Sequence, residues 1–225
     1  MAKKNFKKED EQLQNVNGAM STASQWFEKN ENILTWILTG VIVVVLGIVA
    51  LNNYVFKPKS AEAANENAKC EIYFLQGDFA KALNGDDADC LGFEEVAKQY
   101  GFYKEGKLAA LYAGICYYEQ GEYEEAVKFI QKYKAKDMTI NPAASQLLGD
   151  AYVEMNEYAK AAQAFENAAK SGNMLIAPMS LKKAGLVYLE MENKAAAKKA
   201  FTTIKTKYAQ SQEASEIDKY IALCE

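Results

Sequence analysis

Few of the side chains that most often carry chemistry occur in this chain of 225 residues. It has no histidine, and all 26 of its basic residues are lysine. Without imidazole, histidine-ligated zinc sites and the Ser-His or Cys-His pairs of nucleophilic catalysis are excluded. Without arginine, bidentate recognition of phosphate or of guanine is excluded as well.

Four cysteines remain as reactive groups, and they allow two interpretations. They are Cys70, Cys90, Cys116 and Cys224, and their spacings of 20, 26 and 108 residues match no metal-binding pattern. An even number of cysteines permits disulfides in an oxidising compartment. Cys116, however, directly precedes Tyr117 in a predicted helix where small residues pack inward, and Cys70 holds a comparable place in an earlier helix. We therefore favour small buried hydrophobic residues over disulfides.

Carboxylates are plentiful, but no arrangement of them predicts a catalytic site. Asp86, Asp87 and Asp89 cluster in a turn-rich stretch, yet the twelve-residue ligand spacing and the closing glutamate of a calcium-binding loop are missing. No glycine-rich loop resembles a phosphate-binding cradle. We expect a solvated acidic loop, no metal, no cofactor and no catalytic residue, and hence a protein that is not an enzyme.

The elements that would position any functional side chain repeat with a period of about 35 residues. Gly114, Gly149 and Gly185 are separated by 35 and 36 residues. Three further residue types recur at fixed offsets: tyrosine (Tyr117, Tyr152, Tyr188), alanine (Ala126, Ala161, Ala197) and a bulky apolar residue (Ile130, Phe165, Phe201). Over residues 106–210 the chain resembles the tetratricopeptide repeat family, which implies stacked helix–turn–helix units.

The repeated glycines predict where helices come close together. Glycine inside a helix costs about 1 kcal/mol relative to alanine, so we expect the two helices of each repeat to approach closely at these positions. The repeated alanines would be the small partners on the second helix. The tyrosines and the bulky apolar residues would fill the space between neighbouring pairs.

An uncharged segment of 19 residues, Ile33–Leu51, predicts a transmembrane helix. Such a helix is about 28 Å long, close to the thickness of a bilayer core, and Trp36 and Tyr54 near its ends suit the two interfaces. A cleaved signal peptide is the alternative. It is less favoured because 32 residues precede the apolar segment and because that segment exceeds the usual length of a signal peptide core.

Together these patterns predict an all-α chain. A transmembrane helix (33–51) is followed by a linker helix with a degenerate first repeat (52–105), three full repeats (106–210) forming an α-solenoid of helical hairpins, and a C-terminal capping helix (211–225). Residues 1–32 form a polar tail. The apolar residues of that tail predict either a short amphipathic helix or a mostly disordered segment; they are Leu13, Val16, Met20, Ala23 and Phe27.

Charge indicates topology and limits the partners. Five lysines precede the predicted span and three follow it closely, which favours a cytoplasmic amino terminus and a repeat domain outside the cytoplasm. After Ser60, 19 lysines stand against 25 acidic residues, a net charge of about −6. A negative domain repels nucleic acid and anionic lipid.

The first helices of the repeats are expected to line a concave groove that binds protein. The predicted lining residues are Leu111, Ile115, Tyr118, Gln146, Asp150, Val153, Lys182, Leu186 and Leu189. An apolar groove suits an extended hydrophobic segment or an amphipathic helix. Alternatively, several of these residues simply pack between neighbouring helices. The terminal-carboxylate recognition used by some co-chaperones of this family is not expected, because only Lys183 fits that pattern.

A narrower resemblance rests on architecture. A lysine-rich tail, the Trp26–Asn30 stretch, one span, the Ala82–Phe93 segment and an exported repeat array resemble bacterial inner-membrane proteins of the YfgM-like group. That resemblance implies an ancillary subunit of the Sec translocon, single-pass in the inner membrane, whose periplasmic repeats help to hand exported chains to chaperones. A scaffold for cell-envelope or outer-membrane assembly and a cytosol-facing receptor are the alternatives.

Overall fold

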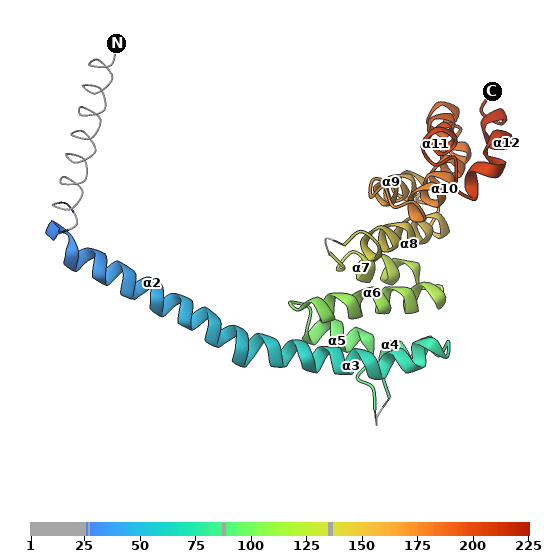
Figure 1. Ribbon diagram of the computed structural model, residues 1–225. Coiled ribbons are helices and arrows are strands. Elements are labelled where there is room, and N and C mark those ends of the chain that lie inside the picture. The colour runs from blue at the N-terminus through green and yellow to red at the C-terminus, as the bar shows by residue number, and fades with distance from the viewer. Residues whose placement is uncertain (1–25, 27, 87–88, 135–136) are drawn as a thin grey trace, which may run out of the picture. The chain divides into compact units, whose positions relative to one another are not determined.

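The computed structural model describes residues 26, 28–86, 89–134 and 137–225. Throughout these residues the regular structure is helical, and no strand is formed in them. The chain divides between Lys57 and Pro58 into two compact units, which we describe separately (Figure 1). The all-α prediction is confirmed.

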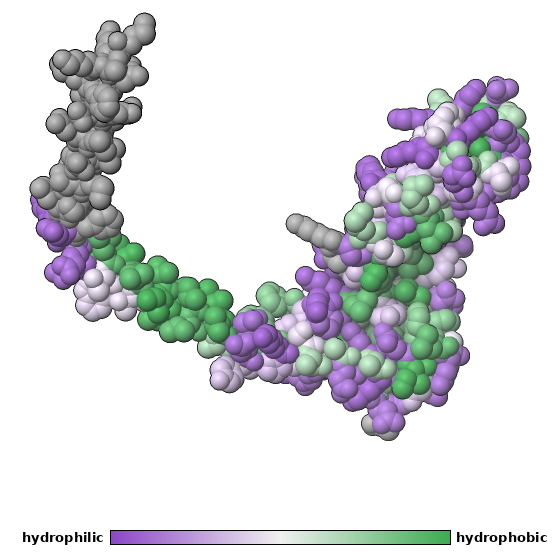
Figure 2. Space-filling model, viewed as in Figure 1, coloured by the Kyte–Doolittle hydropathy of each residue, from purple (hydrophilic) through white to green (hydrophobic). Residues whose placement is uncertain are grey.

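The first unit contains helix α2 (Glu31–Leu51) and a π-helical turn, η1 (Asn52–Phe56). No residue of α2 is buried, and its side chains form a continuous hydrophobic surface (Figure 2). The hydroxyls of Thr35 and Thr39 donate to the carbonyls of Glu31 and Thr35, each at 2.8 Å, so the helix itself satisfies these polar groups. Within the described residues, this is the helix long and apolar enough to cross a membrane. The five apolar tail residues, Leu13 to Phe27, lie outside the described part.

The second unit begins with α3 (Lys57–Leu75), α4 (Phe79–Asn84) and α5 (Phe93–Gln99). The Asp78 carboxylate caps α4 by accepting the N–H of Lys81. Phe74 on α3 and Phe93 on α5 both contact the ring of Tyr112, with centroid distances of 5.1 and 4.7 Å. These aromatic contacts join α3 and α5 to the repeats that follow.

Three helical hairpins follow. They are α6 (Lys104–Glu119) with α7 (Tyr123–Ile130), α8 (Ile140–Glu154) with α9 (Tyr158–Ala169), and α10 (Ile176–Glu190) with α11 (Lys194–Lys207). The repeated tyrosine has a backbone role in ending the first helix: its carbonyl accepts the N–H five residues later, at 2.8–2.9 Å, in all three hairpins. The residue just before the N–H donor has a positive φ in each hairpin; it is Gly121, Asn156 or Glu192. This is the Schellman geometry that closes a helix.

The repeated glycines do mark close approaches, but their partner differs from the expected one. A Cβ added to Gly149 would lie 2.5 Å from the ring of Phe165, and one added to Gly185 would be closer still to the ring of Phe201. The bulky residue sixteen positions on therefore packs against the glycine of its own repeat. The repeated alanines are fully buried beside this contact.

A short 3₁₀ turn, η2 (Glu213–Glu216), and helix α12 (Ile217–Ala222) close the array. Ile217 is 1% exposed, and the ring of Tyr220 lies 5.4 Å from that of Phe201. These residues cover the apolar face of α11, which would otherwise be exposed at the end of a repeat stack.

The favoured interpretation of the cysteines is wrong for two of the four. Cys70 on α3 and Cys90, in the loop before α5, form a disulfide with a Cα–Cα distance of 5.3 Å. Cys116 and Cys224 are free and buried, as expected of small hydrophobic residues. The sequence predicts that Cys70 faces inward. It does not predict that the loop with Cys90 folds back against α3, because that depends on tertiary structure.

Candidate partner-binding surface

The nine predicted groove residues all lie on the first helices α6, α8 and α10. Polar side chains join these helices to one another at intervals of one repeat. The Ser180 hydroxyl on α10 donates to Gln146 Oε1 on α8 at 3.0 Å, and Gln146 Nε2 lies 3.2 Å from the sulfur of Met179. Gln146 therefore connects two repeats, and less of its amide is available to a partner.

Asp150 and Lys183 form the next connection between α8 and α10. Lys183 Nζ donates to both carboxylate oxygens of Asp150 at 2.7 Å. Burial raises the pKa of Asp150, and the lysine opposes that shift without cancelling it. The pKa of Tyr118 on α6 is also raised, first by burial and then by the Asp150 carboxylate.

Lys182 continues the series to the end of the array. Its Nζ donates to Glu216 of η2, and it lies 5.3 Å from the ring centroid of Tyr220. Hydrogen bonds from Lys182 and Lys219 lower the pKa of Glu216 to about 2. Lys182 thus joins the last full repeat to the cap.

The apolar groove residues differ in how much of each is accessible. Leu111 is buried in the core. Ile115, Tyr118, Val153 and Leu189 are half-buried and pack against core clusters. Leu186 is 37% exposed, as is its α10 neighbour Met179 at 38%. Accessible apolar surface on this face is therefore concentrated on α10.

The tetratricopeptide repeat family model matches residues 93–139 and 147–211. The chain contains tetratricopeptide repeats (TPRs). Such repeats indicate a scaffold for protein–protein interaction, and their hairpins are those described above.

Solved structures of MamA have the same fold as this TPR chain. One is 22% identical, with a TM-score of 0.50, covering 69% of this chain and 91% of that one. A second is 21% identical with a TM-score of 0.52, covering 74% and 90%. A third, of MamA AMB-1, is 16% identical with a TM-score of 0.54, covering 73% and 81%. The comparison with curated protein sequences gives no match.

The TPR surface has no lysine free for a partner's terminal carboxylate at the position where the family pattern would place one. That position is Lys183, and its ammonium group already donates to both carboxylate oxygens of Asp150. Among the described residues, no group of three or more metal-ligating side chains is present. The accessible chemistry of this face is consequently apolar, with carboxylates and lysines that are largely paired within the array.

Proposed function

We propose that this chain is a membrane-anchored TPR scaffold that binds apolar segments of protein partners on the face formed by α6, α8 and α10. The observation that carries the proposal is the pair of exposed apolar side chains on α10, Leu186 and Met179, beside internally paired polar groups. Such a surface favours extended hydrophobic segments or amphipathic helices. It requires no catalytic group.

Helix α2 is the proposed anchor. Its length matches a bilayer core, and its two threonines return their hydroxyls to the helix backbone. In hydrocarbon, unsatisfied polar groups cost several kcal/mol, so this arrangement suits a lipid environment. The absence of buried residues along α2 distinguishes it from the core helix of a soluble domain.

The Cys70–Cys90 disulfide favours export of the repeat domain. Disulfides persist in oxidising compartments and are rare in the cytosol. The lysine bias, five before the span and three after it, points to the same topology. We infer an inner-membrane protein with periplasmic repeats, which fits a role in passing exported chains from the Sec translocon to chaperones.

Topology is tested with introduced cysteines, because Cys90 is bridged and Cys224 is only 8% exposed. Met191→Cys lies in the exposed turn after α10, and Glu28→Cys precedes the span. In intact spheroplasts, an impermeant maleimide should label position 191 and should label position 28 only after lysis. The reverse pattern would place the repeats in the cytosol.

Leu186 should dominate partner capture. A photo-crosslinking amino acid at position 186, in the full chain in membranes of its own cells, should give discrete protein adducts. Met191, 39% exposed but in the turn at the end of α10, is the matched control and should give few. Leu186→Ser should weaken capture about tenfold, the effect of losing about 1.4 kcal/mol at an interface. Equal crosslinking from both positions would disprove the binding face.

A further inference from the structure

Three large apolar residues recur at one exposed repeat position. Phe102, Met138 and Met174 are each 36 residues apart and are 77%, 73% and 63% exposed. Each lies in the loop that precedes a first helix: α6, α8 or α10. Leu175, at 75% exposure, extends the third loop. We call Phe102, Met138, Met174 and Leu175 the edge row.

Contacts between consecutive loops place the edge row along one side of the repeat domain. Asn173 Nδ2 donates to the carbonyl of Met138 at 3.2 Å, which joins the third loop to the second. Residues at the start of α6 and in the second loop, among them Lys104 and Lys134, line a shared hollow. Lys59 Nζ lies 5.8 Å from the ring centroid of Tyr100, so the start of α3 lies beside the first loop.

Hydrogen bonds within the loops hold the edge row in place. Asp137 Oδ1 accepts the N–H groups of Thr139 and Asn141, both at 3.0 Å. Asn173 Oδ1 does the same for Leu175 and Ile176, at 2.9 and 3.1 Å. The exposed apolar side chains of the second and third loops are therefore carried on backbone that these side-chain hydrogen bonds fix.

The charge around the edge row differs from that of the whole domain. Lys104, Lys134 and Lys170 flank the row and are exposed, with the Lys104 side chain 88% accessible. The acids near the row are each engaged by a neighbouring group. Glu105 is 13% accessible and lies 3.6 Å from Lys104 Nζ, and Asp137 accepts backbone N–H groups of its own loop. Glu62, whose side chain is 52% accessible, pairs with Lys59 at 3.0 Å. At physiological ionic strength charges are screened beyond about 8 Å. The local lysines, rather than the net charge of about −6, consequently determine what approaches this edge.

Few residues of chain separate the proposed anchor from the start of α3. Only residues 52–57 separate the end of α2 from Pro58. Six residues span at most about 20 Å. The start of α3, which contacts the first loop, therefore follows the proposed span after this short stretch of chain.

We propose that the edge row docks on the anionic phospholipid surface from which the anchor emerges. This inference rests on the anchoring proposed above. The apolar side chains enter the headgroup region while the flanking lysines bind lipid phosphates, the combination that holds amphipathic surfaces at an interface. Docking would hold the α6, α8 and α10 face at a fixed orientation to the membrane, ready for chains that emerge there.

The test uses the full chain in vesicles of phosphatidylcholine and phosphatidylglycerol that contain nitroxide-labelled lipid. An environment-sensitive fluorophore is attached at Met138→Cys, Met174→Cys or Met191→Cys; the native free thiols are buried. Emission from positions 138 and 174 should be quenched several-fold more than emission from the control position 191. Replacing Lys104, Lys134 and Lys170 with glutamine, or omitting phosphatidylglycerol, should reduce that difference.

The outcomes separate the two proposals. A chain that fails to float with the vesicles disproves the anchor and, with it, the docking. A chain that floats while positions 138 and 174 are quenched no more than position 191 disproves only the docking, and leaves the edge row as a surface for protein. If quenching at positions 138 and 174 is unchanged both in the glutamine variant and in vesicles without phosphatidylglycerol, the proposed recognition of anionic lipid is disproved.

Discussion

Replacing both Cys70 and Cys90 with alanine should lower the free energy of unfolding of the repeat domain by about 3 kcal/mol. A disulfide that closes a loop of about 20 residues contributes roughly that amount by restricting the unfolded chain. Both cysteines are almost fully buried, at 0% and 3% exposure, so the bond also lies within the core of the first helices. Chemical denaturation of the purified chain measures the effect.

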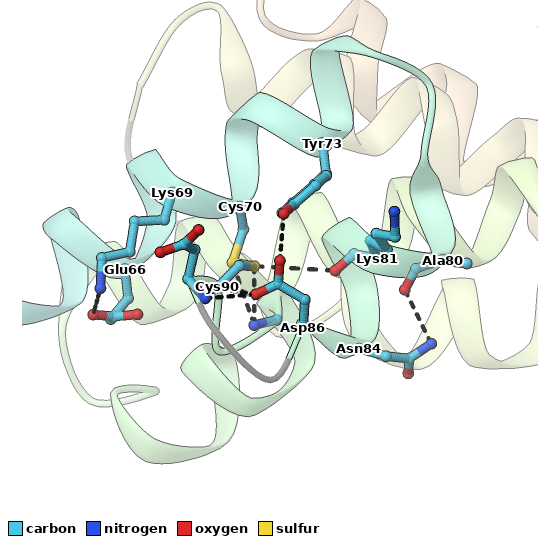
Figure 3. The surroundings of a disulfide bond; sticks show 11 residues. Glu66, Lys69, Cys70, Tyr73, Ala80, Lys81, Asn84, Asp86 and Cys90 are labelled. Carbon is cyan, nitrogen blue, oxygen red and sulfur yellow. Dashed lines mark hydrogen bonds and ion pairs between the residues drawn. A yellow bond between two sulfur atoms is a disulfide. The ribbon is translucent and has the colours of Figure 1, made fainter.

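Hydrogen bonds next to the disulfide also fix the loop that carries Cys90, so loss of the disulfide should loosen this loop as well as destabilise the whole domain (Figure 3). Asp86 Oδ1 accepts the N–H groups of Asp89 and Cys90 at 2.7 and 2.8 Å, and the Tyr73 hydroxyl donates to Asp86 Oδ2. The loop is thus fixed to α3 by the disulfide and by a carboxylate. Without the disulfide, the hydrogen bond from Tyr73 to Asp86 would still connect the loop to α3.

Reductant provides the control for this prediction. The wild-type chain should become less stable on reduction and approach the stability of the double variant, whose stability should not respond. A wild-type chain that is equally stable with and without reductant would contradict the structural role of the bond. It would also remove an argument for the exported location, since disulfides are rare in the cytosol.

The hairpins could be predicted from sequence because each repeat imposes several constraints at once. Gly149 must accommodate Phe165, and Tyr152 must end its helix with a backbone bond to Glu157. These requirements recur every 35 or 36 residues, so the helix positions predicted for one repeat also predict those of the next. The same register placed all nine groove residues on the first helices.

The connections between repeats could not be predicted in the same way. Asp150 and Lys183 are 33 residues apart, and their contact depends on the exact stacking of α8 on α10. The disulfide loop depends on Gly85 and Gly92, both left-handed with φ of +86°. Their positive φ angles let the chain return to α3. A glycine in a sequence does not reveal whether its conformation is left-handed, so the sequence does not predict the pairing of Cys90 with Cys70.

Gly106→Ala should destabilise the repeat domain by about 3 kcal/mol, although helix propensity alone predicts the opposite sign. Gly106 lies in the first turn of α6, where alanine would otherwise gain about 1 kcal/mol. A Cβ there would overlap the carbonyl of Tyr100 and lie 2.7 Å from the nitrogen of Gly101. Contact with backbone is costly because backbone cannot change rotamer, and overpacking typically costs 1–3 kcal/mol, occasionally more.

The corner between α5 and α6 has little freedom to relieve this clash. The Tyr100 carbonyl accepts the N–H of Tyr103 at 2.8 Å, and the Tyr100 ring is only 4% exposed. Gly121→Ala is the matched control: its φ is +79° but nothing lies within 4 Å of the added Cβ, so only the left-handed strain of about 1 kcal/mol applies. Denaturation of the two variants should rank Gly106→Ala well below Gly121→Ala. The opposite ranking would mean that the corner can move, and that the first loop of the edge row is not held where the structure places it.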